Sequence, residues 1–305
     1  MKSGFLTALI VILLAGGLLA NYAVLNDLLD IRSEQPLPTL SRGSDDLRDR
    51  PRVRIGVISR YAPSVIYAGY QPIMDYLNHN GTYTYELRLS TSYQDAVDRL
   101  RAHEVEASFL GAWIYGHLEA EADLVPIAAP LNENGRSEFQ SLLVTRTDSD
   151  LQGIGDLRGR SVALPSAQSW SGNWLQTSGL ATARLTVADL DSLHHFDHHQ
   201  TVVWQVLRGN FDAGVVKEAV AARYSDEGLR VIARSRPIPG PPLVSHRGVP
   251  AAIRQELGTL LLALDPADPD DRRILDSWTP EFSHGFTAVA REQYLSAFGN
   301  GGDER

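Results

Sequence analysis

Residues 165–174, PSAQSWSGNW, place two serine hydroxyls and a glycine at one turn. The turn follows an apolar run at 161–164 and precedes a short helix that we expect from about Gly172. Ser169 and Ser171 can donate hydrogen bonds, and a glycine lets the backbone come close to a ligand. Amide groups at a helix start attract negative charge. The turn therefore indicates either an ordinary serine helix cap or an anion site, and packing is the default for Trp170 between the serines.

Tyr93 and His199 stand at two other expected helix starts. Tyr93 falls in the first turn of a helix predicted over 92–104, and His199 precedes a helix predicted from Thr201. A phenol, an imidazole and serine hydroxyls together suit an oxyanion with several acceptor oxygens.

The run HHFDHH, 194–199, raises the question of a metal site, because imidazoles and carboxylates are zinc ligands. We favour a solvated loop in which only His199 has a functional role, because the expected loop lacks the helical spacing of a preformed metal site. The chain has no GxSxG, no P-loop lysine motif and no HExxH. We therefore expect no metal, no cofactor and no catalysis.

The composition excludes several classes of site. The 305 residues contain no cysteine, which rules out disulfides, thiolate metal sites, cysteine nucleophiles and an acylated N-terminal cysteine. The net charge is −9, from 28 Lys and Arg against 37 Asp and Glu. An acidic balance argues against binding to nucleic acid, which requires a basic face.

The N-terminus predicts contact with a membrane. Lys2 precedes an uncharged, apolar run that continues to Leu25 and is long enough to span a bilayer. We expect residues 1–25 to be a membrane anchor, with a cleaved signal peptide as the alternative. Residues 26–52 are polar and contain prolines, and we interpret them as a linker.

From residue 53 onward, strand-like and helix-like segments alternate, which predicts an α/β fold with largely parallel sheets. We expect two α/β lobes, the first built from 53–144 and 242–298 and the second from 145–241. Two crossings between lobes leave a ligand cleft, and ligands of such sheets bind at the carboxyl ends of strands.

Five segments occur in one order: RIGVISRYAPSVIYAGYQPIMDYL, SYQDAVDRLRAHEVEASFLGAW, DLRGRSVALPSAQSWSGNWL, VLRGNFDAGVV and LRVIARSRPIPGPPLVSH. Together they resemble the phosphonate- and phosphite-type periplasmic substrate-binding proteins of ABC transporters. No single motif is strong, but the ordered set is specific. The resemblance implies a type II periplasmic-binding fold that closes around a small oxyanion.

The resemblance also implies roles for individual residues. The family's Ser-Thr-Ser-Gly turn corresponds to Ser169, Trp170, Ser171 and Gly172, with a tryptophan in place of the threonine. Its oxyanion-binding tyrosine corresponds to Tyr93 and its histidine to His199. A second pocket tyrosine and an amine-holding acid fall on Leu110 and Pro241, so both contacts are lost, although Glu218 could correspond to a second family acid. These departures favour phosphite, methylphosphonate or phosphate over an aminoalkylphosphonate.

We therefore expect a monomeric solute-binding protein at the periplasmic or extracytoplasmic face, delivering a small oxyanion to an ABC transporter permease. Two alternatives remain at this point. The protein could report its ligand to a separate membrane sensor, or it could be an enzyme that uses a metal or a histidine.

Overall fold

The computed structural model describes residues 49–118 and 123–298. The anchor or signal segment predicted for residues 1–25 and nearly all of the predicted linker lie outside the described residues. In the part of the chain that the structure describes, no helix is both long and apolar enough to cross a bilayer.

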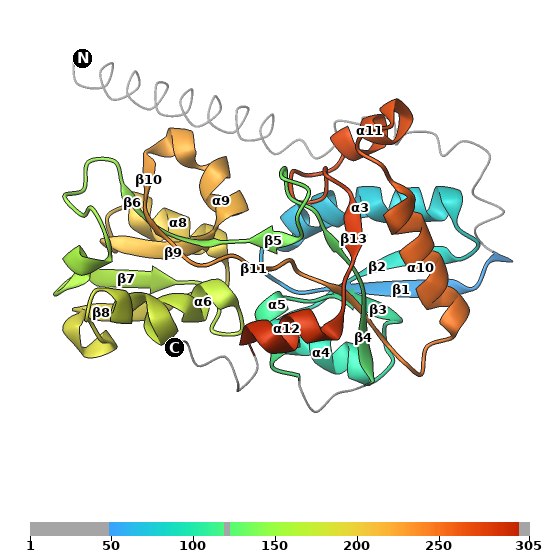
Figure 1. Ribbon diagram of the computed structural model, residues 1–305, viewed down its shortest axis with the longest axis horizontal. Coiled ribbons are helices and arrows are strands. Elements are labelled where there is room, and N and C mark those ends of the chain that lie inside the picture. Colours follow the sequence, from blue (N-terminus) through green and yellow to red (C-terminus); the bar gives the residue numbers. More distant parts are fainter. Residues whose placement is uncertain (1–48, 119–122, 299–305) are drawn as a thin grey trace, which may run out of the picture. The chain divides into compact units, whose positions relative to one another are not determined.

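Six strands form the first sheet, in the order β13-β4-β12-β3-β1-β2 (Figure 1). Their bounds are β1 Arg52–Val57, β2 Thr84–Leu89, β3 Ala107–Phe109, β4 Leu124–Pro130, β12 Leu243–His246 and β13 Phe286–Ala288. β1 is parallel to β2 and β3, whereas β12 is antiparallel to β3 and β4. Val53, Ile55 and Val57 alternate along β1 and are fully buried, as the two-residue period of a strand requires.

The helices of this lobe are α3 Pro63–Asn80, α4 Tyr93–Arg101, α5 Ala112–Gly116, α10 Ala251–Ala263, α11 Pro269–Asp276 and α12 Arg291–Phe298. α3 shows how the sequence builds them. It begins with a proline, whose missing N–H costs nothing at a first turn. Its buried residues Ile66, Tyr70, Ile73 and Leu77 recur at helical spacing and face the core.

Five strands form the second sheet, in the order β10-β6-β9-β7-β8. Their bounds are β6 Ser141–Arg146, β7 Ser161–Leu164, β8 Ser192–His195, β9 Ala213–Lys217 and β10 Leu229–Arg234. β7 is parallel to β8 and β9, and β6 is antiparallel to β9 and β10. The helices of this lobe are α6 Trp170–Trp174, α7 Leu180–Thr182, α8 His199–Leu207 and α9 Glu218–Arg223. The predicted α/β class is therefore confirmed, but the expectation of largely parallel sheets is wrong, because β4, β6, β10, β12 and β13 pair antiparallel with their neighbours.

Two short strands, β5 Glu138–Phe139 and β11 Ile238–Pro239, pair antiparallel where the chain crosses between the lobes (Figure 1). The structure corrects the first predicted lobe boundary, at 144/145. β6 begins at Ser141 and pairs only with strands of the second sheet, so this boundary lies before Ser141. The apolar run in β6 would be buried equally well in either sheet, so its pattern could not show which sheet it joins.

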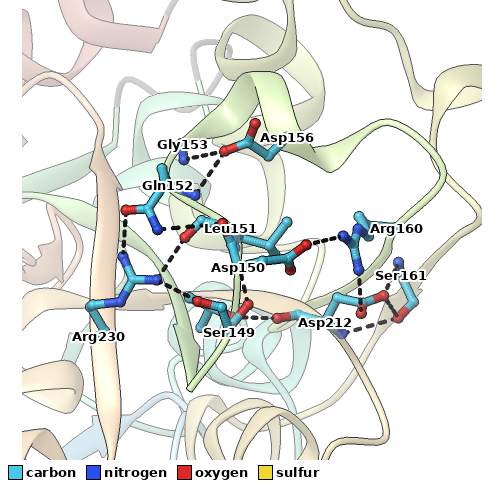
Figure 2. Close-up of polar contacts among 11 residues, drawn as sticks. Ser149, Asp150, Leu151, Gln152, Gly153, Asp156, Arg160, Ser161, Asp212 and Arg230 are labelled. Atoms are coloured by element: carbon cyan, nitrogen blue, oxygen red, sulfur yellow. Dashed lines mark hydrogen bonds and ion pairs between the residues drawn. The ribbon is translucent and has the colours of Figure 1, made fainter. Parts of the chain in front are cut away.

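Asp212 holds the start of β7 beside β9. Its carboxylate accepts hydrogen bonds from the Ser161 backbone N–H at 2.8 Å and from the Ser161 hydroxyl at 2.7 Å (Figure 2). At the same edge, the Arg230 guanidinium donates to the carbonyl oxygens of Ser149 and Leu151 at 3.0 and 2.7 Å. The Asp212 contacts fix the amino end of β7, whereas the Arg230 contacts hold the segment after β6 to β10. The opposite end of β7 leads into the serine turn.

Candidate functional site

A small cavity of about 30 Å³ lies between the two lobes. The polar side chains that line it are Arg60, Tyr93, Ser169, Ser171, His199 and Lys217. Each of these residues is less than a tenth exposed. The structure thus brings together five of the seven residues predicted from the sequence, namely Tyr93, Ser169, Trp170, Ser171 and His199.

Strand ends from both sheets position these residues. Arg60 follows β1, and Lys217 is the last residue of β9. The serine turn follows β7, while Tyr93 and His199 are the first residues of α4 and α8. The carboxyl ends of parallel strands in an α/β sheet form its usual ligand edge, and here two such edges face one cavity.

The two serines of the turn have different surroundings. Ser169 is the N-cap of α6, since its hydroxyl accepts the Gly172 N–H at 3.1 Å and donates to the Ser166 carbonyl at 2.8 Å. The Ser171 hydroxyl lies 2.8 Å from that of buried Ser141 and takes no part in capping. The alternative of a helix cap therefore describes Ser169 but not Ser171. If Ser141 donates this bond, the proton of Ser171 is left for a ligand.

Gly172 supports the turn without lining the cavity. A Cβ atom at this position would lie 2.1 Å from the Ser166 carbonyl oxygen, far inside contact distance. The glycine is therefore required because two stretches of backbone approach closely.

Trp170 forms one wall of the cavity. Its ring centroid lies 5.4 Å from that of Trp113, which also lines the cavity from the other lobe. Its indole N–H already donates to the Ser235 hydroxyl at 3.3 Å. Trp170 therefore offers a ligand an aromatic surface rather than a donor.

His199 presents a neutral ring. The Lys217 backbone N–H donates to Nδ1 at 3.3 Å, so the ring proton of a neutral imidazole resides on Nε2. Burial, together with the charges of Arg60 and Lys217, lowers the pKa of His199 to about 3. Nε2 has no hydrogen-bond partner among the described residues, so its N–H is available to a ligand.

Sequence analysis missed three charged residues at this cavity. Glu281 Oε2 lies 2.8 Å from Arg60 Nη2, and its Oε1 lies 2.6 Å from Lys217 Nζ. Burial opposes all three charges, but Glu281 raises the pKa of Arg60, and the two cations lower the pKa of Glu281 to about 2. Burial lowers the pKa of Lys217, which Glu281 offsets only in part. Arg60 Nε is also buried without a partner among the described residues.

One signal could have revealed Lys217. The chain has only two lysines, Lys2 and Lys217, against 26 arginines. The second lysine ends the otherwise apolar strand AGVVK, where a cation must face a site or a partner. No comparable signal marks Arg60 or Glu281, because they approach Lys217 only in the folded chain.

The histidine run is divided between a strand and a helix, rather than forming the expected loop. His194 and His195 end β8, and His199 begins α8. His195 Nδ1 lies 2.8 Å from the Pro165 carbonyl oxygen, and His198 Nδ1 lies 3.0 Å from that of Ser59. Within the described ranges, no three His, Asp or Glu side chains are grouped as metal ligands would be.

The model of one protein family, the periplasmic phosphonate substrate-binding proteins of ABC transporters, matches residues 55–294. The chain belongs to this family. By that description its members are periplasmic substrate-binding proteins of ABC transporters. The resemblance identified from the sequence is thereby confirmed.

Solved structures confirm the predicted type II periplasmic-binding fold. A binding-protein component of a phosphonate ABC transporter from Pseudomonas aeruginosa is 18% identical, with a TM-score of 0.71, over 81% of this chain and 84% of that one. PhnD1 from Prochlorococcus marinus, in complex with methylphosphonate, is 17% identical, with a TM-score of 0.67, over 80% and 94%. XAC2383 from Xanthomonas citri, bound to ATP, is 19% identical, with a TM-score of 0.61, over 81% and 96%. At these identities the comparison shows a shared fold.

Two further residues stand where the resemblance led us to expect contacts to the ligand. Leu110, at the expected position of a second tyrosine, is fully buried in the core. Pro241, at the expected position of an acid, lines the cavity without a charge. Glu218 begins α9 and instead lines a neighbouring cavity of about 430 Å³, where its carboxylate accepts the Gln140 N–H at 3.2 Å.

Proposed function

We propose that the protein captures a small phosphorus oxyanion, namely phosphite, methylphosphonate or phosphate, in this cavity. The observation that carries the proposal is the pair of buried cations, Arg60 and Lys217, on the wall of a cavity with room for only a few heavy atoms. A buried cation strongly favours an anion beside it, because the surrounding protein screens the attraction far less than water does. The donors of Ser171, His199 and Tyr93 complete the set.

In this proposal the protein delivers the oxyanion from the periplasmic side to a transporter permease, as its family membership supports. The small cavity and the uncharged Pro241 argue against an aminoalkylphosphonate. Methylphosphonate in the related Prochlorococcus protein is the type of ligand that the cavity would accommodate.

Calorimetric titration with phosphite, methylphosphonate, phosphate and 2-aminoethylphosphonate tests the proposal. We expect one of the first three to bind most tightly. Lys217→Met should weaken this binding by at least tenfold, whereas Arg208→Met, on an exposed surface, should leave it unchanged. Failure of all four compounds to bind would contradict the proposed function, and tightest binding of 2-aminoethylphosphonate would assign the amine to the cavity beside Glu218.

A further inference from the structure

The charges at the cavity are arranged in two layers. Arg60 and Lys217 line the cavity, whereas Glu281 does not, although it bonds both cations. Two cations and one carboxylate leave a net charge of +1 next to the ligand. This charge lies beside the oxyanion site of the proposed function, so an inference about its ligand rests on that function.

His199 and three neighbouring tyrosines add no charge to this sum. His199 is neutral, and burial raises the pKa values of Tyr61, Tyr70 and Tyr93, so these phenols keep their protons. Among the further charges, Glu218 acts on Lys217 and Arg223 acts on Tyr61, and the two have opposite signs. His198, which also acts on His199, bonds the Ser59 carbonyl through its ring.

Ser169 adds an independent observation. A serine hydroxyl has one proton, and that of Ser169 is donated to the Ser166 carbonyl. One lone pair accepts the Gly172 N–H, which leaves the second lone pair as the only hydrogen-bonding capacity of this hydroxyl. At the cavity wall, Ser169 can therefore accept a hydrogen bond but cannot donate one. An acceptor suits a protonated P–OH group and repels an ionised oxygen.

We infer that this site selects the singly charged, protonated form of its oxyanion over the doubly charged form, with Glu281 and Ser169 as the specificity-determining residues. A monoanion neutralises the net charge of the cluster, whereas a dianion would leave one buried negative charge without compensation, which is costly. The P–OH group of the monoanion donates to Ser169. Its two unprotonated oxygens share the single negative charge, and they accept from the cations and from the donors of His199 and Ser171.

Binding measured against pH tests this inference on the wild-type protein. Methylphosphonate and phosphite are titrated across roughly pH 5.5–8.5, in pairs of buffers with different ionisation heats. Above the second pKa of each ligand, we expect affinity to fall by about tenfold per pH unit and one proton to be taken up on binding. The onset must move with the ligand, since the two compounds have different second pKa values.

The outcomes separate the two proposals. Affinity that is level or rises with pH, or binding without proton uptake, would overturn the inference but leave the proposed function intact. The inference is also wrong if proton uptake begins at one pH for both ligands, because a protein group such as Lys217 would then be titrating. Absence of binding at every pH would instead contradict the proposed function.

Two variants examine the residues directly. Glu281→Gln raises the site charge to +2. The loss of affinity between the low and the high end of the pH range should then be at least tenfold smaller than in the wild type. Glu227→Gln, an exposed carboxylate without an ion pair among the described residues, should behave as wild type. If Glu281→Gln does not fold, Ser169→Ala tests the inference instead. It should weaken binding about tenfold at low pH, where the ligand carries its proton, and much less at high pH; equal loss at both ends would contradict the role of Ser169.

Discussion

At the scale of single residues, Ser169 and Ser171 belong to one short motif, but their hydroxyls have different hydrogen-bond partners. Both line the cavity, and they are two positions apart. The Ser169 hydroxyl is committed to the backbone on both sides, whereas Ser171 meets only Ser141. Both are serines of one motif, but only the Ser171 hydroxyl keeps its proton for a ligand, when Ser141 donates the bond between the two.

Ser171→Ala should weaken oxyanion affinity by roughly tenfold to a hundredfold, because a hydrogen bond to a charged group is worth about 1.5–3 kcal/mol. Calorimetry with methylphosphonate measures the change. The matched control is Ser141→Ala, which removes the same serine–serine bond but leaves the Ser171 hydroxyl in place. Similar losses of affinity in the two variants would show that the bond between the serines, not the ligand contact, matters.

The buried neutral His199 should make stability depend on pH. Its pKa is about 3 in the folded chain and 6.5 ordinarily, so the unfolded chain binds more protons between these values. Stability is therefore lost as pH falls below about 6.5, with a limiting slope of about 1.4 kcal/mol per pH unit. The carboxylate of Glu281, with a folded pKa of about 2, adds its own loss only below its ordinary 4.5.

Urea unfolding of the ligand-free protein at several pH values between 6.5 and 4.5 measures this slope. His199→Asn should flatten it, because the replacement cannot titrate, whereas His194→Asn, at an exposed position in the same run, should not. An unchanged slope in His199→Asn would show that other groups account for the loss.

At the scale of elements, the serine turn works because a strand passes into a very short helix. β7 ends at Leu164, and α6 occupies only Trp170–Trp174 before a π-helical turn at Leu175–Gly179. The turn is held by its own backbone, through Ser169 and through the close approach of Gly172 to Ser166. The geometry of the site is therefore a property of this junction.

Gly172→Ala should distort the turn and abolish or strongly reduce oxyanion binding, since its Cβ would lie 2.1 Å from a carbonyl oxygen. Gly258→Ala is the matched control. Gly258 lies within α10, where a Cβ would meet only a side-chain atom at 3.5 Å, so alanine should stabilise the fold by about 0.5–1 kcal/mol. Thermal unfolding and ligand titration of both variants measure the contrast. Wild-type affinity in Gly172→Ala would mean that the turn can relax.

At the scale of the whole molecule, the site is assembled from both lobes. Arg60 and Glu281 come from the lobe of the first sheet and Lys217 from that of the second, so the ion pair between Lys217 and Glu281 crosses between lobes. His198 adds a hydrogen bond to the Ser59 carbonyl across the same boundary. Ligand affinity and the contact between lobes therefore depend on the same charged residues.

A fragment of residues 49–305 should unfold cooperatively and bind the oxyanion as tightly as the full chain, because the chain after Asp49 forms one compact unit. Thermal unfolding and calorimetry on both proteins make the comparison.

In cell fractionation, we expect the full chain in the membrane fraction and the fragment in the soluble fraction. A full chain with a mature start near Val24 would replace the predicted anchor with a cleaved signal peptide.

The sequence by itself determined the α/β class, the alternation of strands and helices and the serine turn, because periodicity and turn residues are local properties. Strand 161–164 and the helix after His199 follow from the neighbouring residues alone. Tyr93, Ser169, Ser171 and His199 could be selected because each stands where a helix begins.

Only the tertiary structure decided which sheet β6 joins and which charges meet at the cavity. Arg60, Lys217 and Glu281 are separated by 157 and 64 positions, and nothing local marks one as the partner of another. The protonation of His199 and the acceptor role of Ser169 likewise depend on burial and on where each hydrogen bond goes. These are properties of packed side chains, which a pattern along the chain does not contain.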